Sequence, residues 1–326
     1  MAVEEISKIR ADLAKLVDRN NRLSEKAARE FALKKGIDIK DVIELKGDLK
    51  LINELYRFID KYISIQKNRS IPSNVKFEKI NANGVPAEWI ITPNAKNKQM
   101  IFYLYSGGFM WGSLETRRFI PYLLGRATKL RCLNIGYRLA PEHPFPAALE
   151  DSVNAYKWLL STGINSNNII IAGSSAGGGL SIATMLKLRD LGLQLPTAAV
   201  LLSPWVDLTC EGESLKTNAK FSPFGPILVK IMAKAYLNKE KSTNPFASPV
   251  FANLKGLPPL LIQAGSIEIL LDDSISLANK AKSAGISVDL EIWKGMTHVF
   301  HNFGDDLSDS KNAFKNISKF IQKNII

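Results

Sequence analysis

Cysteine and histidine are scarce in this sequence. Of its 326 residues, two are cysteine and three are histidine. Two cysteines cannot build the dense disulfide framework of a small secreted domain. Cys132 falls in a predicted buried strand, so we expect no structural disulfide with Cys210 and a protein compatible with a reducing compartment.

Long hydrophobic runs are also lacking. No apolar run approaches the roughly 20 residues that a membrane-spanning helix needs. The first eight residues, MAVEEISK, carry too many charges for a secretory signal. We therefore expect a cytoplasmic protein without stable membrane insertion.

Clustered charge is lacking too, although the formal net charge is +12. A basic surface attracts phosphates, but the lysines are scattered along the chain. Near the C-terminus they recur every fourth residue from Lys311 to Lys323, opposite the apolar Phe314 and Ile317. This stripe is typical of a solvated helix face, and no aromatic-interleaved basic patch accompanies it. We expect no nucleic-acid partner.

Length and periodicity predict one large α/β core with an accessory helical part. Residues 1–66 have the apolar spacing of helices, strands dominate up to Tyr105, and helix and strand patterns then alternate to the end. Such alternation indicates a mostly parallel sheet covered on both faces. We predict a helical segment at 1–66 and a main domain at 67–326. Between about 207 and 253, turns surround one predicted helix at 226–237, which indicates an insertion.

The most informative motif is GSSAG at 173–177, with Ser175 at its centre. It follows an apolar run that reads as a buried parallel strand and precedes a helix. A serine on a tight strand-to-helix turn has strained backbone angles, and small residues at positions 173 and 177 avoid collision with the turning chain. The motif predicts an exposed nucleophilic serine. The alternative is a glycine-rich turn that only allows close packing.

His298 is the best-placed general base for such a serine. It follows the predicted strand VDLEI at 288–292, so a loop can carry it over the carboxyl edge of the sheet. We expect His301 to line the loop into the last helix. His143 lies in a proline-rich turn before the serine motif, and we expect it to be structural.

Glu268 is the predicted acid, because it lies within a few residues of the end of the strand at 259–264. Beside His298, its carboxylate would fix the imidazole tautomer and stabilise the imidazolium ion. Asp272 and Asp273 lie a turn further on, and we expect them to cap and charge the first turn of the next helix.

Backbone donors for an oxyanion are predicted at Gly107 and Gly108, which follow another buried strand. Without a Cβ atom, these residues can present their N–H groups to a ligand. The N–H of Ala176, next after the serine, would complete the hole.

Together these motifs resemble the hormone-sensitive-lipase-like branch of the α/β-hydrolases, the microbial carboxylesterases called family IV. The segments YRLAPEHPFPAA at 137–148 and LSPWVDLT at 202–209 extend the resemblance, which covers roughly residues 75–325. It implies an α/β-hydrolase fold with a helical cap and hydrolysis of short acyl esters through an acyl-enzyme. It also implies no cofactor and no metal, and this group often forms homodimers.

The sequence departs from the family pattern at three places. Tyr105 and Ser106 replace the histidine and first glycine of the family's HGGG, and displaced donors would cost up to about 3 kcal/mol of transition-state stabilisation. Ile267 replaces an aspartate that many relatives carry, which removes a rival to Glu268. Ser174 stands where relatives have aspartate or threonine, and the turn should tolerate it.

The insertion at 207–253 resembles a cap element that, with residues 1–66, would roof the site. Candidate substrate-binding residues are Phe109, Ser174, Phe221, Phe224, Ile231 and Met232. The alternative for the cap residues is that they only pack the cap onto the body.

We predict a serine carboxylesterase for short acyl esters. A non-catalytic small-molecule binding protein on the same scaffold is an alternative, because the family's fold also serves as a receptor once its histidine is lost. Hydrolysis of amides, lactones or thioesters would use the same triad.

Overall fold

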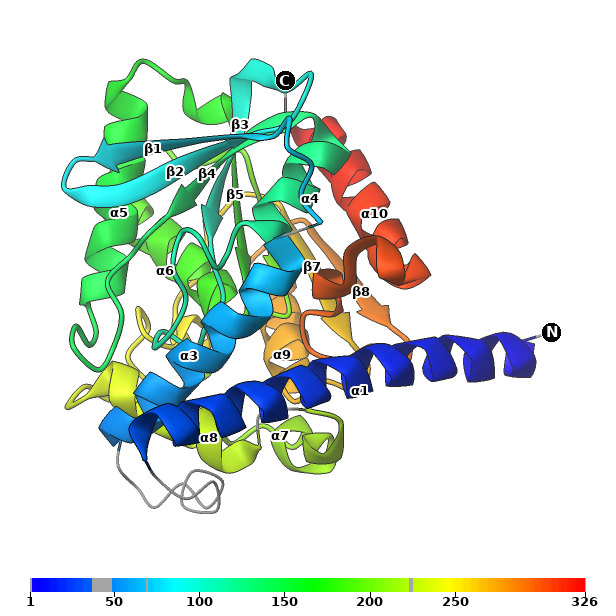
Figure 1. Cartoon of the computed structure of the whole chain (residues 1–326). Coiled ribbons are helices and arrows are strands. Elements are labelled where there is room, and N and C mark those ends of the chain that lie inside the picture. The colour runs from blue at the N-terminus through cyan, green and yellow to red at the C-terminus, as the bar shows by residue number, and fades with distance from the viewer. Residues whose placement is uncertain (1, 37–48, 69, 223–224, 326) are drawn as a thin grey trace.

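The protein is built on a central sheet (Figure 1). A computed structural model describes residues 2–36, 49–68, 70–222 and 225–325. In this part of the chain the sheet has eight strands in the order β1-β2-β4-β3-β5-β6-β7-β8. The pairs β1–β2 and β2–β4 are antiparallel, and all later pairs are parallel. The predicted mostly parallel sheet is confirmed.

The strands of the sheet centre are continuous apolar runs, as expected for parallel strands that are covered on both faces. Every residue of β5, β6 and β7 is buried, whereas the outermost strand β8 is largely half-buried or exposed. The strands are β1 (Lys76–Ala82), β2 (Val85–Ile91), β3 (Lys96–Leu104), β4 (Leu130–Ile135), β5 (Ile169–Ser174), β6 (Ala198–Leu202), β7 (Leu260–Gly265) and β8 (Val288–Trp293).

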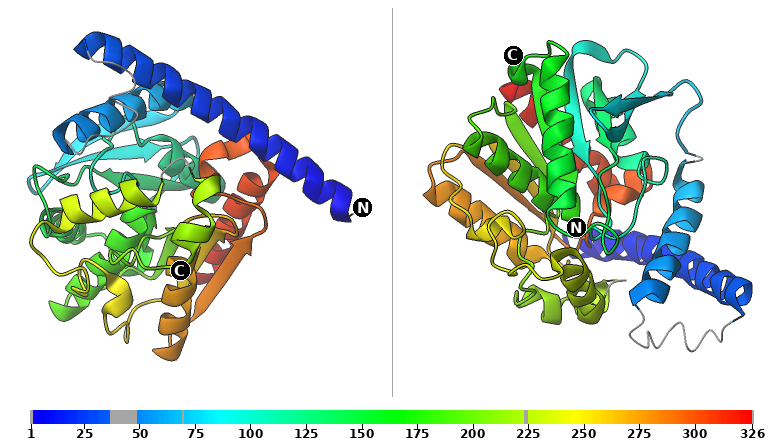
Figure 2. Two further views of the ribbon diagram at one scale, coloured as in Figure 1. Left: turned by 90° about the horizontal axis from the view of Figure 1, so that it is seen from below. Right: turned by 90° about the vertical axis from the view of Figure 1, so that its left-hand side faces the viewer.

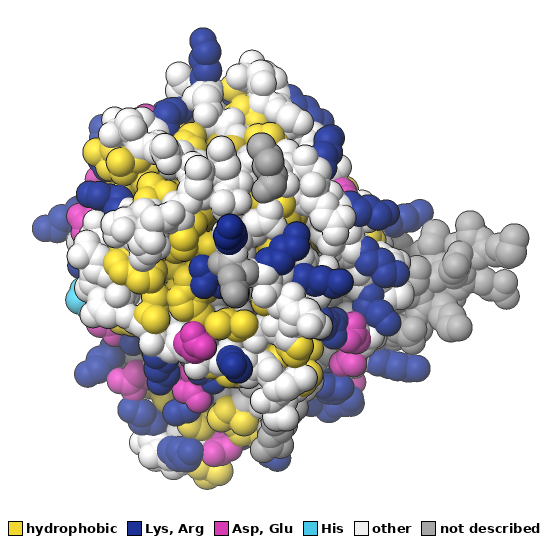
Figure 3. All heavy atoms as spheres, turned by 90° about the horizontal axis from the view of Figure 1, so that it is seen from above, with side chains coloured by type: hydrophobic (Ala, Val, Ile, Leu, Met, Phe, Trp, Pro, Cys, Tyr) yellow, Lys and Arg dark blue, Asp and Glu magenta, His cyan; other side chains and the backbone are white. Residues whose placement is uncertain are grey.

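Helices cover both faces of the sheet (Figures 1 and 2). On one face α4 (Phe119–Thr128) packs against α10 (Ser308–Asn324). The other face carries α5 (Ala147–Ser161), α6 (Ala176–Asp190) and α9 (Leu271–Ser283). On α10 the lysines are exposed and the aromatic and aliphatic residues opposite are buried, so the predicted solvated face is confirmed. Lys and Arg side chains are spread over the face seen in Figure 3.

Two groups of helices lie at the carboxyl ends of the strands (Figures 1 and 2). The first is α1 (Ala2–Lys35), which runs across this end of the molecule, and α3 (Leu49–Asn68) beside it. The second is α7 (Ser214–Thr217) and α8 (Pro226–Leu237), and α8 matches the helix predicted at 226–237. Short 3₁₀ turns are η1 (Ser166–Asn168), η2 (Ala219–Phe221), η3 (Pro249–Phe251) and η4 (Phe300–Asp306).

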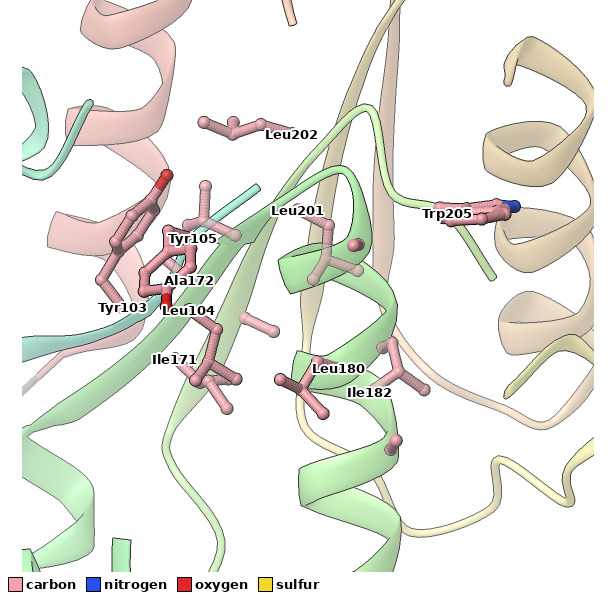
Figure 4. Packing of buried hydrophobic residues seen from close by; sticks show 14 of the residues in the cluster. Tyr103, Leu104, Tyr105, Ile171, Ala172, Leu180, Ile182, Leu201, Leu202 and Trp205 are labelled. Carbon is pink, nitrogen blue, oxygen red and sulfur yellow. The ribbon is translucent and has the colours of Figure 1, made fainter. Parts of the chain in front are cut away.

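The core packs the inner strands directly against α6 (Figure 4). Ile171, Leu201 and Leu180 are at most 1% exposed. Both cysteines are free and buried, which agrees with the expectation of no disulfide between them. Among the described residues, no helix is both long and apolar enough to span a membrane.

Candidate active site

Ser175 occupies a strained turn between β5 and α6. Its φ is 53° and its ψ is −122°, angles that a residue with a Cβ rarely adopts. The glycines on either side are sterically required: a Cβ on Gly173 would lie 2.2 Å from the carbonyl oxygen of Gly177. A Cβ on Gly177 would lie 2.0 Å from the carbonyl oxygen of Leu104 on β3. The turn therefore needs the small residues that its motif supplies.

His298 lies directly beside this serine. Its Nε2 atom is 3.0 Å from Oγ of Ser175, within hydrogen-bond distance. The loop after β8 carries the histidine over the carboxyl edge of the sheet, as the sequence led us to expect, and its side chain is 10% exposed. An imidazole nitrogen at this distance can accept the hydroxyl proton.

Glu268 lies on the other side of the imidazole. Its Oε1 atom is 3.5 Å from Nδ1 of His298, which is longer than a usual N–H···O bond of about 2.7–3.2 Å. Its Oε2 atom accepts the N–H of Gly265 at 2.7 Å and the hydroxyl of Ser203 at 2.7 Å. The carboxylate is completely buried, so these donors supply the solvation that it loses.

Ser203 joins the acid to the histidine loop. Besides donating to Glu268, its Oγ atom accepts the N–H of Val299 at 3.0 Å, and Val299 follows His298 directly. Ser203 has a φ of 49° and Val299 a φ of 47°, which is unusual for a β-branched residue. Its position in the LSPW stretch directly after β6 is the one signal in the sequence that points to this serine.

The segment Ser106–Trp111, which we call the oxyanion segment, makes a tight turn after β3. Three successive residues have positive φ: Gly107 at 137°, Gly108 at 59° and Phe109 at 62°. The N–H groups of Met110 and Trp111 both donate to the carbonyl of Gly107. Both glycines line the same cavity as Ser175, and Ala176 is the first residue of α6.

Tyr105, which replaces the family's histidine, forms a pair with Tyr137. Their rings stack at 4.4 Å with an interplanar angle of 21°. The hydroxyl of Tyr137 donates to the carbonyl of Tyr105 at 2.7 Å. Burial raises the pKa of both phenols well above the usual value, so both hydroxyls keep their protons. This chain therefore holds the start of the oxyanion segment with a tyrosine donor.

A cavity of about 590 Å³ opens above Ser175 and His298, which is within the usual range for a small-molecule site. Both apolar and polar side chains line it. The apolar group includes Trp205, Val229, Met232, Ile269 and Leu270, and the polar group includes Asn20, Asn21, Ser24, Asp60 and Arg117.

The predicted substrate-binding residues fall into two sets. Phe221 and Met232 line the cavity. Phe109, Ser174 and Ile231 are not among the lining residues. The ring of Phe109 stacks on Tyr236 at 3.7 Å, the hydroxyl of Ser174 is hydrogen-bonded to that of Tyr103 at 2.8 Å, and Ile231 packs on the core. Phe224 lies outside the described residues.

The two aspartates after Glu268 have other partners than the expected helix cap. They lie in the first turn of α9, but the N-cap residue is Leu270 and no side chain caps this helix. Asp272 accepts the N–H of Ser214, and Asp273 accepts the N–H groups of Val206 and Asp207. Burial raises the pKa of Asp273 to about 8, although both N–H bonds act in the opposite direction.

The other two histidines have different surroundings from His298. His301 lies in η4, which leads into α10 as expected, and its Nε2 atom is 2.9 Å from Oε1 of Gln263. Burial lowers its pKa to about 3. His143 is exposed in its turn. Among the described residues, no three His, Cys, Asp or Glu side chains gather as a metal site would require.

Known proteins with the same fold resemble this chain. The family described by the alpha/beta hydrolase fold matches residues 101–302, more than half of the chain. The chain belongs to this α/β-hydrolase family. The matched range contains Ser175, Glu268, His298 and both glycines of the oxyanion segment.

The chain is similar to several esterases. An acetyl-hydrolase of Streptomyces hygroscopicus is 40% identical over 237 residues, which are 72% of this chain and 79% of that protein. An esterase of Acinetobacter venetianus is 37% identical over 256 residues, 77% of this chain and 84% of that protein. The crystal structure of an esterase from the bacterial hormone-sensitive lipase family superposes with a TM-score of 0.82 at 39% identity. The superposition covers 95% of this chain and 98% of the chain of that esterase. The predicted membership of the hormone-sensitive-lipase-like group is confirmed.

Proposed function

We propose that this carboxylic ester hydrolase is a serine carboxylesterase that cleaves short-chain acyl esters through an acyl-enzyme. The observation that carries the proposal is the 3.0 Å distance between Nε2 of His298 and Oγ of Ser175 on a strained turn. The buried carboxylate of Glu268 on the far side of the imidazole supports it. In this proposal Glu268 fixes the tautomer in which Nδ1 carries a proton and Nε2 accepts one.

The first half of the reaction forms the acyl-enzyme. Oγ of Ser175 attacks the ester carbonyl while Nε2 of His298 takes the hydroxyl proton. The carbonyl oxygen becomes an oxyanion, and the N–H groups of Gly107, Gly108 and Ala176 stabilise its charge. The bond to the alcohol then breaks, and the imidazolium returns the proton to the leaving oxygen.

The second half releases the acid. A water molecule enters the position of the alcohol and gives a proton to Nε2 of His298 as it attacks the acyl carbonyl. The second tetrahedral intermediate uses the same backbone donors. Its collapse breaks the bond to Oγ, which recovers the proton from His298, and the carboxylic acid leaves.

A short acyl group suits the space beside the oxyanion segment. Met232 packs so closely there that a Cβ on Gly108 would lie 2.0 Å from its sulfur atom. The relative from Streptomyces hygroscopicus bears the name acetyl-hydrolase, which is consistent with a short acyl group. We also propose that residues 1–66 and the insertion at 207–253 act as the cap, because both supply residues that line the cavity.

The test is hydrolysis of p-nitrophenyl esters from acetate to laurate by the wild type and by Ser175→Ala. We expect turnover that is highest for short chains and falls at least about a thousandfold in the variant, as for other serine nucleophiles. Circular dichroism shows whether the variant is folded. A folded wild type without turnover of any ester would favour the ligand-binding alternative, and turnover of amides or lactones alone would change the substrate class.

A further inference from the structure

Helix α3 contacts the oxyanion segment through residues within one helical turn. The ring of Tyr56 stacks on that of Trp111 at 5.0 Å with an interplanar angle of 17°. Nε of the adjacent Arg57 donates to the carbonyl of Met110 at 3.1 Å. Near the other end of the segment, Asp60 pairs with Arg117, whose Nε donates to the carbonyl of Ser106 at 3.1 Å. The helix thus supports both ends of the segment.

Arg117 makes the contact that bears most directly on the chemistry. Its planar guanidinium bonds the Ser106 carbonyl through Nε and the Asp60 carboxylate through a terminal nitrogen. The side chains of Arg117 and Asp60 are only 20% and 10% exposed. Solvent therefore screens this ion pair less than one on the open surface, and the carboxylate holds the guanidinium in place.

The Ser106 carbonyl belongs to the same peptide unit as the N–H of Gly107. A peptide unit is planar and trans, so fixing the direction of its C=O also fixes the direction of its N–H. Gly107 has a φ of 137°, and glycine allows many other angles at low cost. The backbone alone would therefore leave this peptide free to rotate, and Arg117 removes that freedom.

The hydroxyl of Tyr137 acts in the same way on the peptide before it. It donates to the carbonyl of Tyr105 and so fixes the Tyr105–Ser106 peptide. Two successive peptides at the start of the oxyanion segment are thus held by side-chain donors. The first donor comes from the body of the protein, and the second is anchored on α3.

We propose that Arg117 is a positioning residue for the reaction: anchored by Asp60 of α3, it orients the Gly107 N–H toward the oxyanion. This inference rests on the proposed esterase function. It also means that the oxyanion hole is complete only when α3 is docked on the body, so that the N-terminal helices contribute to catalysis without touching the substrate's reacting atoms.

The test compares turnover with affinity for a mimic of the tetrahedral intermediate. A short alkyl trifluoromethyl ketone adds to a catalytic serine and places an oxyanion in the hole, whereas ground-state binding of the ester depends less on these donors. In Arg117→Met we expect kcat for p-nitrophenyl acetate to fall about 10- to 100-fold, with KM within about threefold. The inhibition constant of the ketone should rise by a similar factor.

Arg189→Met is the matched control. Arg189 also bonds loop carbonyls, those of Asn253 and Lys255, and also pairs with an aspartate. It lies at the far end of α6 from Ser175. We expect its kcat and ketone affinity to match the wild type. An equal loss in Arg189→Met, or a lower kcat in Arg117→Met with unchanged ketone affinity, would overturn the proposal.

Removing Arg117 alone leaves the half-buried Asp60 carboxylate without this partner, which is destabilising. The double variant Asp60→Asn/Arg117→Met avoids this, and we expect the same kinetic loss from it. Asp60→Asn alone keeps the bond to Ser106 but frees the guanidinium, so a smaller loss is expected. Full ketone affinity in the folded double variant would overturn the proposal. Wild-type turnover reports separately on the esterase function.

Discussion

The sheet edge and the helices above it hold the candidate active site in different ways. At the sheet edge the geometry is made by backbone: Gly173 and Gly177 leave no room for a Cβ, and Ser175 takes angles imposed by the turn. The helices above contribute side chains instead. Met232 of α8 lies against Gly108, and Asp60 of α3 pairs with Arg117, which bonds the oxyanion segment.

The helices nevertheless reach the loop that carries His298. Leu13 of α1 belongs to a small cluster with Met296 and Phe300, which flank His298 in the chain. The edge of the sheet thus sets which atoms face each other, whereas the helices shape the cavity and hold the loops in place. Substitutions in the two regions should have different consequences.

The largest expected difference is in stability. Gly177→Ala should lower the free energy of unfolding by about 3 kcal/mol or more, because the new Cβ meets a carbonyl oxygen of the sheet backbone that cannot move aside. Gly225→Ala, at the start of α8, adds a Cβ with no atom within 4 Å, so the loss should be about 1 kcal/mol. Urea unfolding followed by circular dichroism measures both. Equal losses in the two glycine variants would contradict the contrast.

The second difference concerns the acyl group, and it separates two neighbours on α8. Met232→Ala should open space beside Gly108. Each additional buried methylene contributes about 0.8 kcal/mol, so kcat/KM for p-nitrophenyl octanoate relative to acetate should rise about tenfold. Ile231→Ala is the control, because Ile231 packs on the core and is not among the lining residues. An equal shift in both variants would show that looser cap packing, and not the space at Gly108, sets the chain length.

The motifs at the sheet edge were readable from the sequence because each requires particular residue types at fixed spacing. The apolar runs that became β5, β7 and β8 were placed within two residues, since buried parallel strands leave a continuous signal. The turn at Ser175 and the histidine loop were found for the same reason. At the sheet edge the sequence therefore predicts both the type of each element and its residue range.

Side-chain direction above the sheet was not readable in this way. Phe109 was expected at the substrate, but its ring stacks on Tyr236 of α8. Asp273 was expected to cap its own helix; it lies in the first turn, but its carboxylate accepts N–H groups after β6. The pairing of Asp60 with Arg117 joins segments far apart in the chain. Each of these contacts depends on a partner that is distant in the sequence and near only in the folded chain. A local sequence pattern therefore cannot predict them.

The smallest expected effect concerns the buried imidazole of His301 in η4. His301 has no exposed surface, its ring contacts the rings of Phe300 and Phe314, and burial lowers its pKa to about 3. In the unfolded chain an imidazole has a pKa near 6.5. Between these two values the unfolded state binds more protons, so stability is complete above about pH 6.5 and is lost as the pH falls toward 3.

By pH 6 this protonation should lower the free energy of unfolding by about 0.8 kcal/mol relative to pH 7.5. Asp273, whose pKa is raised to about 8 by burial, acts in the opposite direction over this range. Urea unfolding of the wild type and of His301→Gln at both pH values therefore measures the His301 contribution as the difference between their pH dependences. His301→Gln should remove that part of the pH dependence, whereas His143→Gln, which changes an exposed side chain, should retain it. If both variants kept the full wild-type dependence, the lost stability would belong to another group. The folded and unfolded states would then bind a proton at His301 equally well, which the complete burial of this side chain opposes, because burial disfavours the charged imidazolium.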